Sequence, residues 1–387
     1  MTIEIDDLGP EVIVHVSDVV TGMRGILVID NTVLGPTGGG CRMMPNITDL
    51  EVAQLARSMT YKFGILGLPR GGCKSGLWGD PAMPAEEKRG LLRAFGRALQ
   101  PLLETKAAAV GPDMGVTAAD VRDIYDGAGV AQLRSGLFER VHEGDPAAYH
   151  ITGHGVIASA MAAAEVIGMP FRGARIAVEG FGQVGAGTCR RAVREGAVVV
   201  GISTLEGGLH DEGGLDVEQL LALRRTHGDR LVHEYRGGER IPSESIYFVP
   251  ADVVVPGARP WVIDEGNCAR VQARIVASGG NITVTRGADQ MLFQRGVLSV
   301  PDFIASAAAA LASWVDFLGG SLDHAFGAID RVLGGITTKV VQEAQKAAVS
   351  PYEVATGMVR KRIDDARGQP RKTFEQTREE IRALLGM

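Results

Sequence analysis

Residues 175–185, which read Arg-Ile-Ala-Val-Glu-Gly-Phe-Gly-Gln-Val-Gly, decide the fold of this chain. A short apolar run leads into glycines spaced as Gly-x-Gly-x-x-Gly, and a helical pattern follows from Ala186 to Glu195. In such a unit the first glycine allows a tight turn, the second lets a pyrophosphate approach the backbone, and the third lets helix and strand pack closely. The alternative is a glycine-rich turn without a ligand. The stretch predicts a dinucleotide site at a helix N-terminus, formed by Gly180, Gly182, Gln183, Val184 and Gly185.

The strand after this helix, Ala197 to Ile202, bears on the choice of cofactor. An acidic residue about 20 positions after the glycines usually binds the adenosine ribose. Thr204 stands at that place and Glu206 follows, so the ribose is held either by Glu206 or through hydroxyl groups. Arginine and lysine are absent from residues 201–220, so nothing there meets a 2′-phosphate. We expect NAD, and NADP is not excluded.

The sequence after the glycine-containing unit predicts further strands of the same sheet. Continuous apolar runs recur at Val253–Val255 and Arg274–Ala277, and helical segments separate them. Such an alternation predicts a parallel sheet covered by helices on both faces. A polar, glycine-containing connection at residues 127–150 is the first candidate domain boundary, and Ile151 to Ile167 reads as an alanine-rich helix.

The first 126 residues mix strands and helices. Glu11–Val16 and Gly25–Asp30 are rich in strand-forming residues. Thr48-Asp49 can cap a helix from Leu50 to Phe63, and helical spacing resumes from Ala85 to Leu103. The fold class expected is α/β with two domains.

Composition limits the function classes. The chain has 387 residues, 45% hydrophobic and 22% charged, which is ordinary for a globular enzyme. The net charge of −6 argues against nucleic acid or an anionic membrane as the main partner. No apolar run reaches the ~18 residues of a membrane span, and the acidic N-terminus lacks the apolar core of a signal peptide. Four separated cysteines without Cys/His clusters fit a reducing cytoplasm and predict no metal site.

The first domain contains candidates for proton transfer. Lys74 and Asp113 stand in the glycine-lined stretches Gly71–Gly76 and Gly111–Gly115, and Lys62 precedes the first of them. Taken singly, each would be read as a surface lysine or a loop cap. Taken together with a hydride-carrier site in the same chain, two cations and a carboxylate indicate redox chemistry on an amine or imine.

Eight stretches resemble the glutamate/leucine/phenylalanine/valine dehydrogenase superfamily, and they occur in the family's order over most of the chain. They are GPTGGGCRM (35–43), RSMTYKFGILGLPRGGCKSG (57–76), GPDMGV (111–116), TGHGV (152–156), VEGFGQVG (178–185), ADVVVPGA (251–258), SGGN (278–281) and VPDFIAS (300–306). Their joint occurrence is far more specific than any one of them.

The resemblance implies roles for the first domain. Lys62 would pair with the substrate α-carboxylate, Lys74 would be the catalytic lysine, and Asp113 the catalytic aspartate. A buried lysine beside another cation gives up its proton more easily, and its ammonium form stabilises a developing oxyanion. An aspartate facing the amino group can exchange protons with it. Arg42 is expected to form a structural ion pair, and Cys73 to be a packed, inert thiol.

For the second domain the resemblance implies cofactor contacts. Thr152 would touch the cofactor or cap a helix, and both roles are compatible. Ala258 and Asn281 lie in loops that would hold the ribose and the nicotinamide carboxamide. Gly38 and Gly39 of the first domain, and Ser306 and Ala310 of the second, would line the substrate.

Departures from the family pattern bear on the substrate. The glutamate enzymes have a lysine where this chain has Gly38, and the leucine enzymes have an apolar residue. Ser306 replaces an asparagine that holds the substrate, and Ala310 replaces a valine that lines the side-chain pocket. A roomier, uncharged pocket predicts an L-amino acid with a bulky apolar side chain.

The expected protein is an NAD(P)-dependent amino acid dehydrogenase. Residues 1–145, completed by helices in 331–387, would form a substrate-binding and oligomerisation domain, and residues 150–330 a Rossmann-type domain, with the active site in the cleft between them. The reaction would be oxidative deamination to a 2-oxo acid and ammonia, or its reverse, in a cytoplasmic homo-oligomer. The alternatives are a specialised imine or keto-acid reductase acting on an unusual metabolite, and a cofactor-binding protein without turnover.

Overall fold

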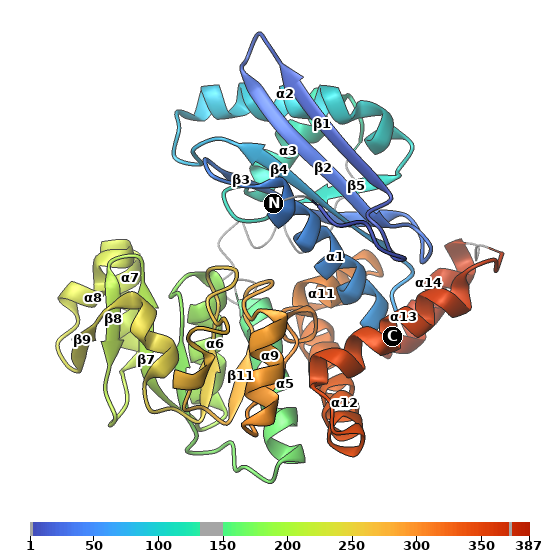
Figure 1. Ribbon diagram of the computed structural model, residues 1–387. Coiled ribbons are helices and arrows are strands. Elements are labelled where there is room, and N and C mark those ends of the chain that lie inside the picture. Colours follow the sequence, from blue (N-terminus) through green and yellow to red (C-terminus); the bar gives the residue numbers. More distant parts are fainter. Residues whose placement is uncertain (1–2, 132–149, 371–373) are drawn as a thin grey trace. The chain divides into compact units, whose positions relative to one another are not determined.

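The computed structural model describes residues 3–131, 150–370 and 374–387, and it contains two compact units (Figure 1). Unit 1 comprises Met1–His142 and Met358–Ile381, and unit 2 comprises Glu143–Gly357 and Arg382–Met387. Most of the connection expected at residues 127–150 lies outside the described residues. Within the described residues, no helix is both long and apolar enough to cross a membrane.

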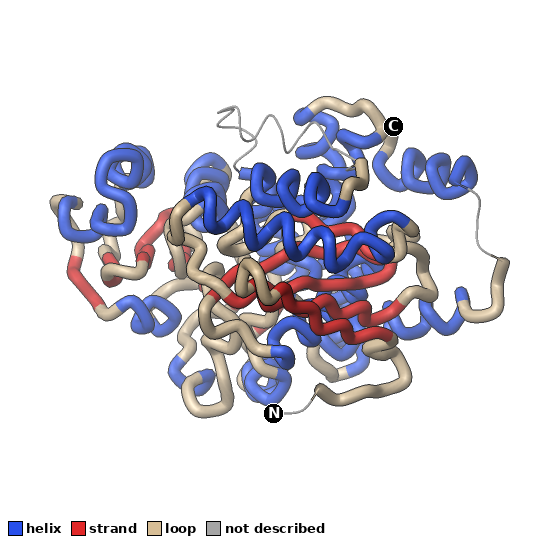
Figure 2. Tube along the Cα trace, turned by 90° about the horizontal axis from the view of Figure 1, so that it is seen from above, coloured by secondary structure: helices blue, strands red, loops and turns tan. Residues whose placement is uncertain are grey.

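Unit 1 is built on a five-stranded sheet in the order β1-β2-β4-β3-β5. α1 packs on one face, where Val52 and Ala56 meet Ile26 and Val28. α2 and α3 cover the other face around Phe95, and Figure 2 shows helices lying over these strands. The bounds are β1 Val12–Asp18, β2 Met23–Asn31, β3 Thr37–Met44, α1 Asp49–Ile65, β4 Gly71–Trp78, α2 Ala85–Glu104, β5 Ala108–Gly111 and α3 Ala118–Ala128.

The strands and helices expected in unit 1 are confirmed, and Thr48 caps α1 by accepting a hydrogen bond from the Glu51 N–H at 3.2 Å. β3 and β4 were not expected, because their glycines lower strand propensity. The structure shows what these glycines permit. A Cβ at Gly39 would overlap the carbonyl oxygen of Cys73, and one at Gly71 would overlap that of Asn31. The glycines therefore let neighbouring backbones approach closely.

Unit 2 is built on a seven-stranded sheet in the order β12-β11-β10-β6-β7-β8-β9. Strands β12 to β7 are parallel, as expected. The bounds of the strands are β6 Arg175–Val178, β7 Val198–Thr204, β8 Gly207–His210, β9 Glu239–Ile241, β10 Val253–Val255, β11 Ile275–Ala277 and β12 Leu298–Val300. The helices are α5 Ile151–Val166, α6 Gln183–Arg194, α7 Val217–His227, α8 Leu231–Glu234, α9 Arg286–Gln294, α10 Asp302–Ala305, α11 Ala308–Phe317, α12 Leu322–Ala347, α13 Pro351–Ala366 and α14 Phe374–Leu385, with α13 and α14 each divided between the two units.

Two features of unit 2 differ from the expected organisation. β8 and β9 are antiparallel, so the sheet is mixed at this edge rather than wholly parallel. A tight turn at Leu205 and Glu206 returns the chain directly after β7 into β8, whose first residue is Gly207 (φ +130°), and this leaves no room for a crossover helix. In addition, α12 belongs to unit 2 and not to the first domain, because it packs against α5, α10 and α11.

Candidate active site

Asp113 and Lys74 form an ion pair in unit 1. Lys74 lies in β4 with 3% of its side chain exposed, and Asp113 lies just after β5 with 14% exposed. A tight turn fixes the carboxylate: the backbones of Asp113 and Val116 exchange hydrogen bonds of 3.1 and 2.9 Å, and the Met114 N–H donates to Asp113 Oδ1 at 2.6 Å. Gly115 has φ +77°, the left-handed region that favours glycine.

Arg42 is the second cation beside Asp113. Its Nη2 lies 3.4 Å from Asp113 Oδ1, and its Nη1 lies 2.7 Å from Glu51 Oε1, so the expected structural ion pair is present. Burial of Asp113 opposes its ionisation, but the charges of Lys74 and Arg42 outweigh this effect and hold the pKa of Asp113 well below its usual range. The carboxylate is therefore ionised at neutral pH.

The other predicted residues of unit 1 lie on the elements around this pair. Lys62 is buried on α1, and α1 packs on β4. Gly38 and Gly39 lie in β3, paired with β4 and β5. Cys73 is 1% exposed, and burial raises the pKa of its thiol, which fits the inert role expected for it.

One residue near these positions was missed by sequence reasoning. The Arg70 side chain lies against Gly38: a Cβ built at residue 38 would be 2.9 Å from Arg70 Nε. The signal was present in the sequence as the residue before Gly71-Gly72. Its significance depends on the fold, because only the fold shows that its side chain occupies the space beside Gly38.

The three glycines of the fingerprint in unit 2 show the tight turn, the open backbone and the close packing expected of them. Gly180 turns the chain with φ +79°, and a Cβ at Gly185 would overlap the Gly180 carbonyl oxygen. A Cβ at Gly182 would meet only Arg224 Nη2, at 4.0 Å, so the backbone there is open to a ligand. α6 begins at Gln183 without a side-chain cap, so its first N–H groups remain available for phosphates.

The ribose candidates lie at the end of β7. Thr204 is 5% exposed, and its hydroxyl donates to the Asp229 carbonyl oxygen at 2.9 Å and accepts from the Glu206 N–H at 3.1 Å. Its hydrogen-bonding capacity is thus used within the protein. The Glu206 carboxylate is half exposed, and Oε2 lies 3.7 Å from His233 Nε2. Glu206 is therefore the better placed of the two for a ribose.

A second missed residue is Glu179, at the end of β6. It is 3% exposed, and its Oε2 accepts hydrogen bonds of 3.0 Å from the N–H groups of both Gly257 and Ala258. Arg259 Nε donates to the other oxygen at 3.1 Å. Glu179 thereby holds the loop of Ala258 against Gly180, whose added Cβ would be 3.1 Å from that of Ala258. Its only sequence signal was its place inside the fingerprint.

The remaining predicted residues of unit 2 are spread over several elements. Thr152 is not the N-cap of α5, since the helix starts at Ile151 and His150 holds that position. Asn281 follows Gly279 and Gly280, where an added Cβ would lie 3.5 and 3.4 Å from the backbone of Gly257. Ser306 ends α10 and donates its hydroxyl to the Asp302 carbonyl oxygen at 2.7 Å, while Ala310 lies on α11.

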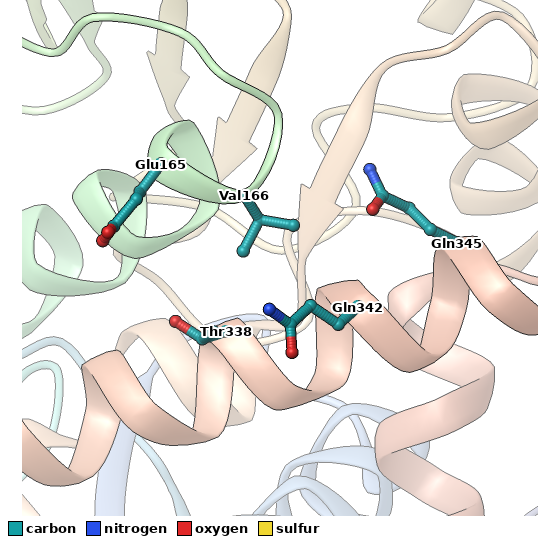
Figure 3. A pocket seen from close by; sticks show the side chains of 5 residues that line it. All are labelled: Glu165, Val166, Thr338, Gln342 and Gln345. Atoms are coloured by element: carbon teal, nitrogen blue, oxygen red, sulfur yellow. The ribbon is translucent and has the colours of Figure 1, made fainter.

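A surface hollow of about 580 Å³ occurs elsewhere in unit 2. Figure 3 shows Glu165 and Val166, from the end of α5, facing Thr338, Gln342 and Gln345 on α12. None of the predicted site residues lines it. The structure thus gathers Lys74, Asp113 and Arg42 in unit 1, and the glycine fingerprint with Ala258 in unit 2.

Comparisons with known proteins relate both parts of the chain to one family. A family model described as Glutamate/Leucine/Phenylalanine/Valine dehydrogenase matches residues 144–369, and one described as the dimerisation domain of the Glu/Leu/Phe/Val dehydrogenases matches residues 10–128. The chain is 34% identical over 344 residues to a glutamate dehydrogenase of Thermotoga maritima, which covers 85% of this chain and 81% of that protein. It is 30% identical to an NADP-specific glutamate dehydrogenase of Saccharolobus shibatae, over 74% of this chain and 69% of that one.

The fold is likewise similar to that of a solved structure. The hetero-hexameric glutamate dehydrogenase from Thermus thermophilus, in its Leu-bound form, superposes with a TM-score of 0.79 and 26% identity, over 94% of this chain and 91% of that chain. The two matching family models together cover most of the sequence. The chain therefore belongs to the Glu/Leu/Phe/Val dehydrogenase family of amino acid dehydrogenases.

Proposed function

We propose that this protein catalyses the NAD-dependent oxidative deamination of an L-amino acid to its 2-oxo acid and ammonia, or the reverse reaction. The observation that carries the proposal is the buried ion pair of Lys74 and Asp113, lined by glycines, in a chain that also has a complete dinucleotide fingerprint. Family membership supports the same class of reaction.

The two groups of the ion pair supply complementary chemistry. Asp113 is ionised, so it can take a proton from the substrate ammonium and leave a neutral amine. After the substrate Cα–H hydride has been removed, water adds to the imine carbon, and the ammonium of Lys74 can stabilise the oxygen charge that develops there. Lys62, buried on α1, is proposed to bind the α-carboxylate.

NAD, when bound, accepts the hydride. The backbone at Gly182 and the uncapped start of α6 are open to a pyrophosphate, as the geometry of these residues allows. Glu206 is proposed to bind the adenosine ribose, and its negative charge would repel a 2′-phosphate. Thr152, Ala258 and Asn281 remain proposed cofactor contacts.

The side chain of the substrate has two candidate classes. Gly38 carries no charge and Ala310 is small, which supports a bulky apolar side chain. The position of Arg70 supports the other class, an anionic side chain, because a guanidinium lies directly beside Gly38. Amino acids of equal length with and without a terminal carboxylate separate these two candidates.

Two rival functions remain testable. A specialised imine or keto-acid reductase is favoured by Ser306 and Ala310, which depart from the family pattern, and a cofactor-binding protein without turnover would bind NADH only. An assay of NADH oxidation with a panel of 2-oxo acids, with and without ammonia, separates them. Ammonia-dependent turnover supports the proposal, ammonia-independent turnover supports the reductase, and binding without turnover supports the third function.

The assembly and location are also proposals. We propose a homo-oligomer, because the family model that matches residues 10–128 is described as a dimerisation domain. A cytoplasmic location is supported by the four cysteines, which are all buried and unpaired.

A further inference from the structure

The side chain of Arg70 occupies the space beside Gly38. A methyl group placed at residue 38 would lie 2.9 Å from Nε and 3.0 Å from Cζ of Arg70. Arg70 stands in the loop between α1 and β4, and its Cζ lies 5.9 Å from the centre of the Phe63 ring. A cation therefore takes the place that a side chain at residue 38 would have filled.

This cation lacks a counter-charge in the part of the chain that the structure describes. No ion pair or side-chain hydrogen bond joins the Arg70 guanidinium to residues 3–131, 150–370 or 374–387. Burial lowers the pKa of Arg70, and the smaller effects of Cys73 and Tyr125 oppose this shift. Since removing a guanidinium from water without an anionic partner is unfavourable, an anion bound there would relieve the cost.

Arg70 also lies on the face of β3 that carries the catalytic pair. Alternate residues of a strand share a face, so Gly38 and Gly40 point the same way. A Cβ at Gly40 would be 3.1 Å from Asp113 Oδ2, whereas one at Gly38 meets Arg70. Two residues along a strand span about 6.6 Å. The distance along β3 from the proposed catalytic pair to Arg70 is therefore about the length of a short amino acid side chain.

We infer that Arg70 binds the anionic end of the substrate side chain, so that the preferred substrate is a 2-amino dicarboxylate. The inference rests on the proposed function, because it takes the reacting carbon to lie at Lys74 and Asp113. A planar guanidinium can hold a carboxylate through two parallel hydrogen bonds. Gly38 then has a definite role: any larger residue would displace the guanidinium.

The test is steady-state kinetics of the full chain with NAD and a matched panel: L-glutamate, L-2-aminoadipate, L-norleucine and L-phenylalanine. Norleucine resembles glutamate in length but has no terminal charge. The first variant is Arg70→Met, which keeps the apolar part of the side chain and removes the charge. The second is Arg70→Lys, which keeps a positive charge but cannot form two parallel hydrogen bonds to a carboxylate. Arg89→Leu is the control, since Arg89 is a half-exposed arginine on α2 that pairs with Glu86 and Asp123.

We expect the wild-type protein to prefer a dicarboxylate over norleucine. Arg70→Met should lower kcat/KM for glutamate or aminoadipate by about 10²–10³-fold, mainly through KM, because a buried charge would lose its partner. Its kcat/KM for norleucine should stay unchanged or rise, and Arg70→Lys should be intermediate. The melting temperature of Arg70→Met should equal or exceed that of the wild type, which shows that folding is intact.

Two outcomes would overturn the inference while the proposed function stands. One is a wild-type preference for norleucine or phenylalanine over both dicarboxylates. The other is an equal loss for all substrates in Arg70→Met, which would give Arg70 a structural role. No NADH formation with any amino acid, and no NADH oxidation with any 2-oxo acid and ammonia, would instead refute the proposed function itself.

Discussion

Arg42 and Lys74 hold the Asp113 carboxylate from two sides, with Arg42 Nη2 3.4 Å from Oδ1 and the Lys74 ammonium paired to Oδ2. The two cations are not equivalent. Arg42 also pairs with Glu51 on α1, whereas Lys74 has no second carboxylate among the ion pairs of the described residues. Arg42 therefore anchors the aspartate to the fold, and Lys74 is the cation that can respond to a substrate.

Replacement of either member of the proposed catalytic pair, Lys74 or Asp113, should reduce turnover strongly. Lys74→Ala and Asp113→Asn are each expected to lower kcat by about 10²–10⁴-fold, the usual contribution of a positioned proton-transfer group. NAD affinity should not change, because the fingerprint belongs to unit 2. Lys88→Ala is the control, since it breaks a 2.8 Å ion pair with Asp120 in the same unit. Near-normal turnover in either catalytic variant would remove that residue from the mechanism.

Two glycines of the fingerprint have separable roles: Gly182 leaves space for a ligand, and Gly185 allows close packing within the protein. Gly182→Ala should leave the melting temperature unchanged but weaken NAD binding, because the added methyl group meets no protein atom closer than 4.0 Å and would point at the pyrophosphate. Gly185→Ala should destabilise the fold, because its methyl group would overlap the Gly180 carbonyl oxygen. Thermal unfolding and NAD titration of the two variants check this pair. Normal NAD affinity in Gly182→Ala would place the phosphates elsewhere.

Cofactor choice should depend on Glu206. We expect higher catalytic efficiency with NAD than with NADP, and Glu206→Ala should weaken NAD use and narrow the difference between the cofactors. Arg224 is the residue that could reverse this order: it pairs with Asp229 at 3.1 Å, and its Nη2 lies near Gly182. A wild-type preference for NADP that is lost in Arg224→Ala would show that this arginine receives the 2′-phosphate.

Asp289 should make stability depend on pH. Burial in α9 raises the pKa of Asp289 to about 6, although hydrogen bonds from Ser350 and Ser299 favour the charged form. In the unfolded chain the carboxyl ionises near pH 3.8, so between about pH 4 and 6 the folded state binds more protons than the unfolded state. Stability due to this group therefore falls as pH rises through that window and stays reduced above pH 6.

Asp289→Asn removes this titration. The variant should match the wild type below about pH 4 and exceed it at pH 7 by a few kcal/mol in the free energy of unfolding, since one pKa unit corresponds to about 1.4 kcal/mol. Denaturant unfolding at several pH values measures the difference. A stability difference that does not vary with pH would show that Asp289 titrates normally in the folded protein.

The sequence predicts correctly those structural elements that depend on residues close together in the chain. The glycine fingerprint, the apolar parallel strands and the Thr48 cap all depend on residues near one another in the chain. β3 and β4 were missed because their glycines serve close backbone contacts that only the assembled sheet reveals. The antiparallel edge formed by β8 and β9 was missed for a similar reason, since a short turn replaced the expected crossover.

The space beside Gly38 shows the same limit more sharply. From the sequence, Gly38 indicated that no charge faces the substrate side chain. In the structure, the empty space at Gly38 is filled by Arg70, which is 32 positions later in the chain. Because Gly38 has no side chain, the guanidinium of Arg70, from the loop before β4, can occupy this space. Comparing residue 38 alone with the family pattern could not reveal this.

The most direct test of the account is NADH oxidation by the purified protein with 2-oxo acids and ammonia, measured by the loss of NADH absorbance. We expect turnover with at least one 2-oxo acid that requires ammonia and disappears in Lys74→Ala. Turnover that proceeds equally well without ammonia, or that survives in Lys74→Ala, would contradict it.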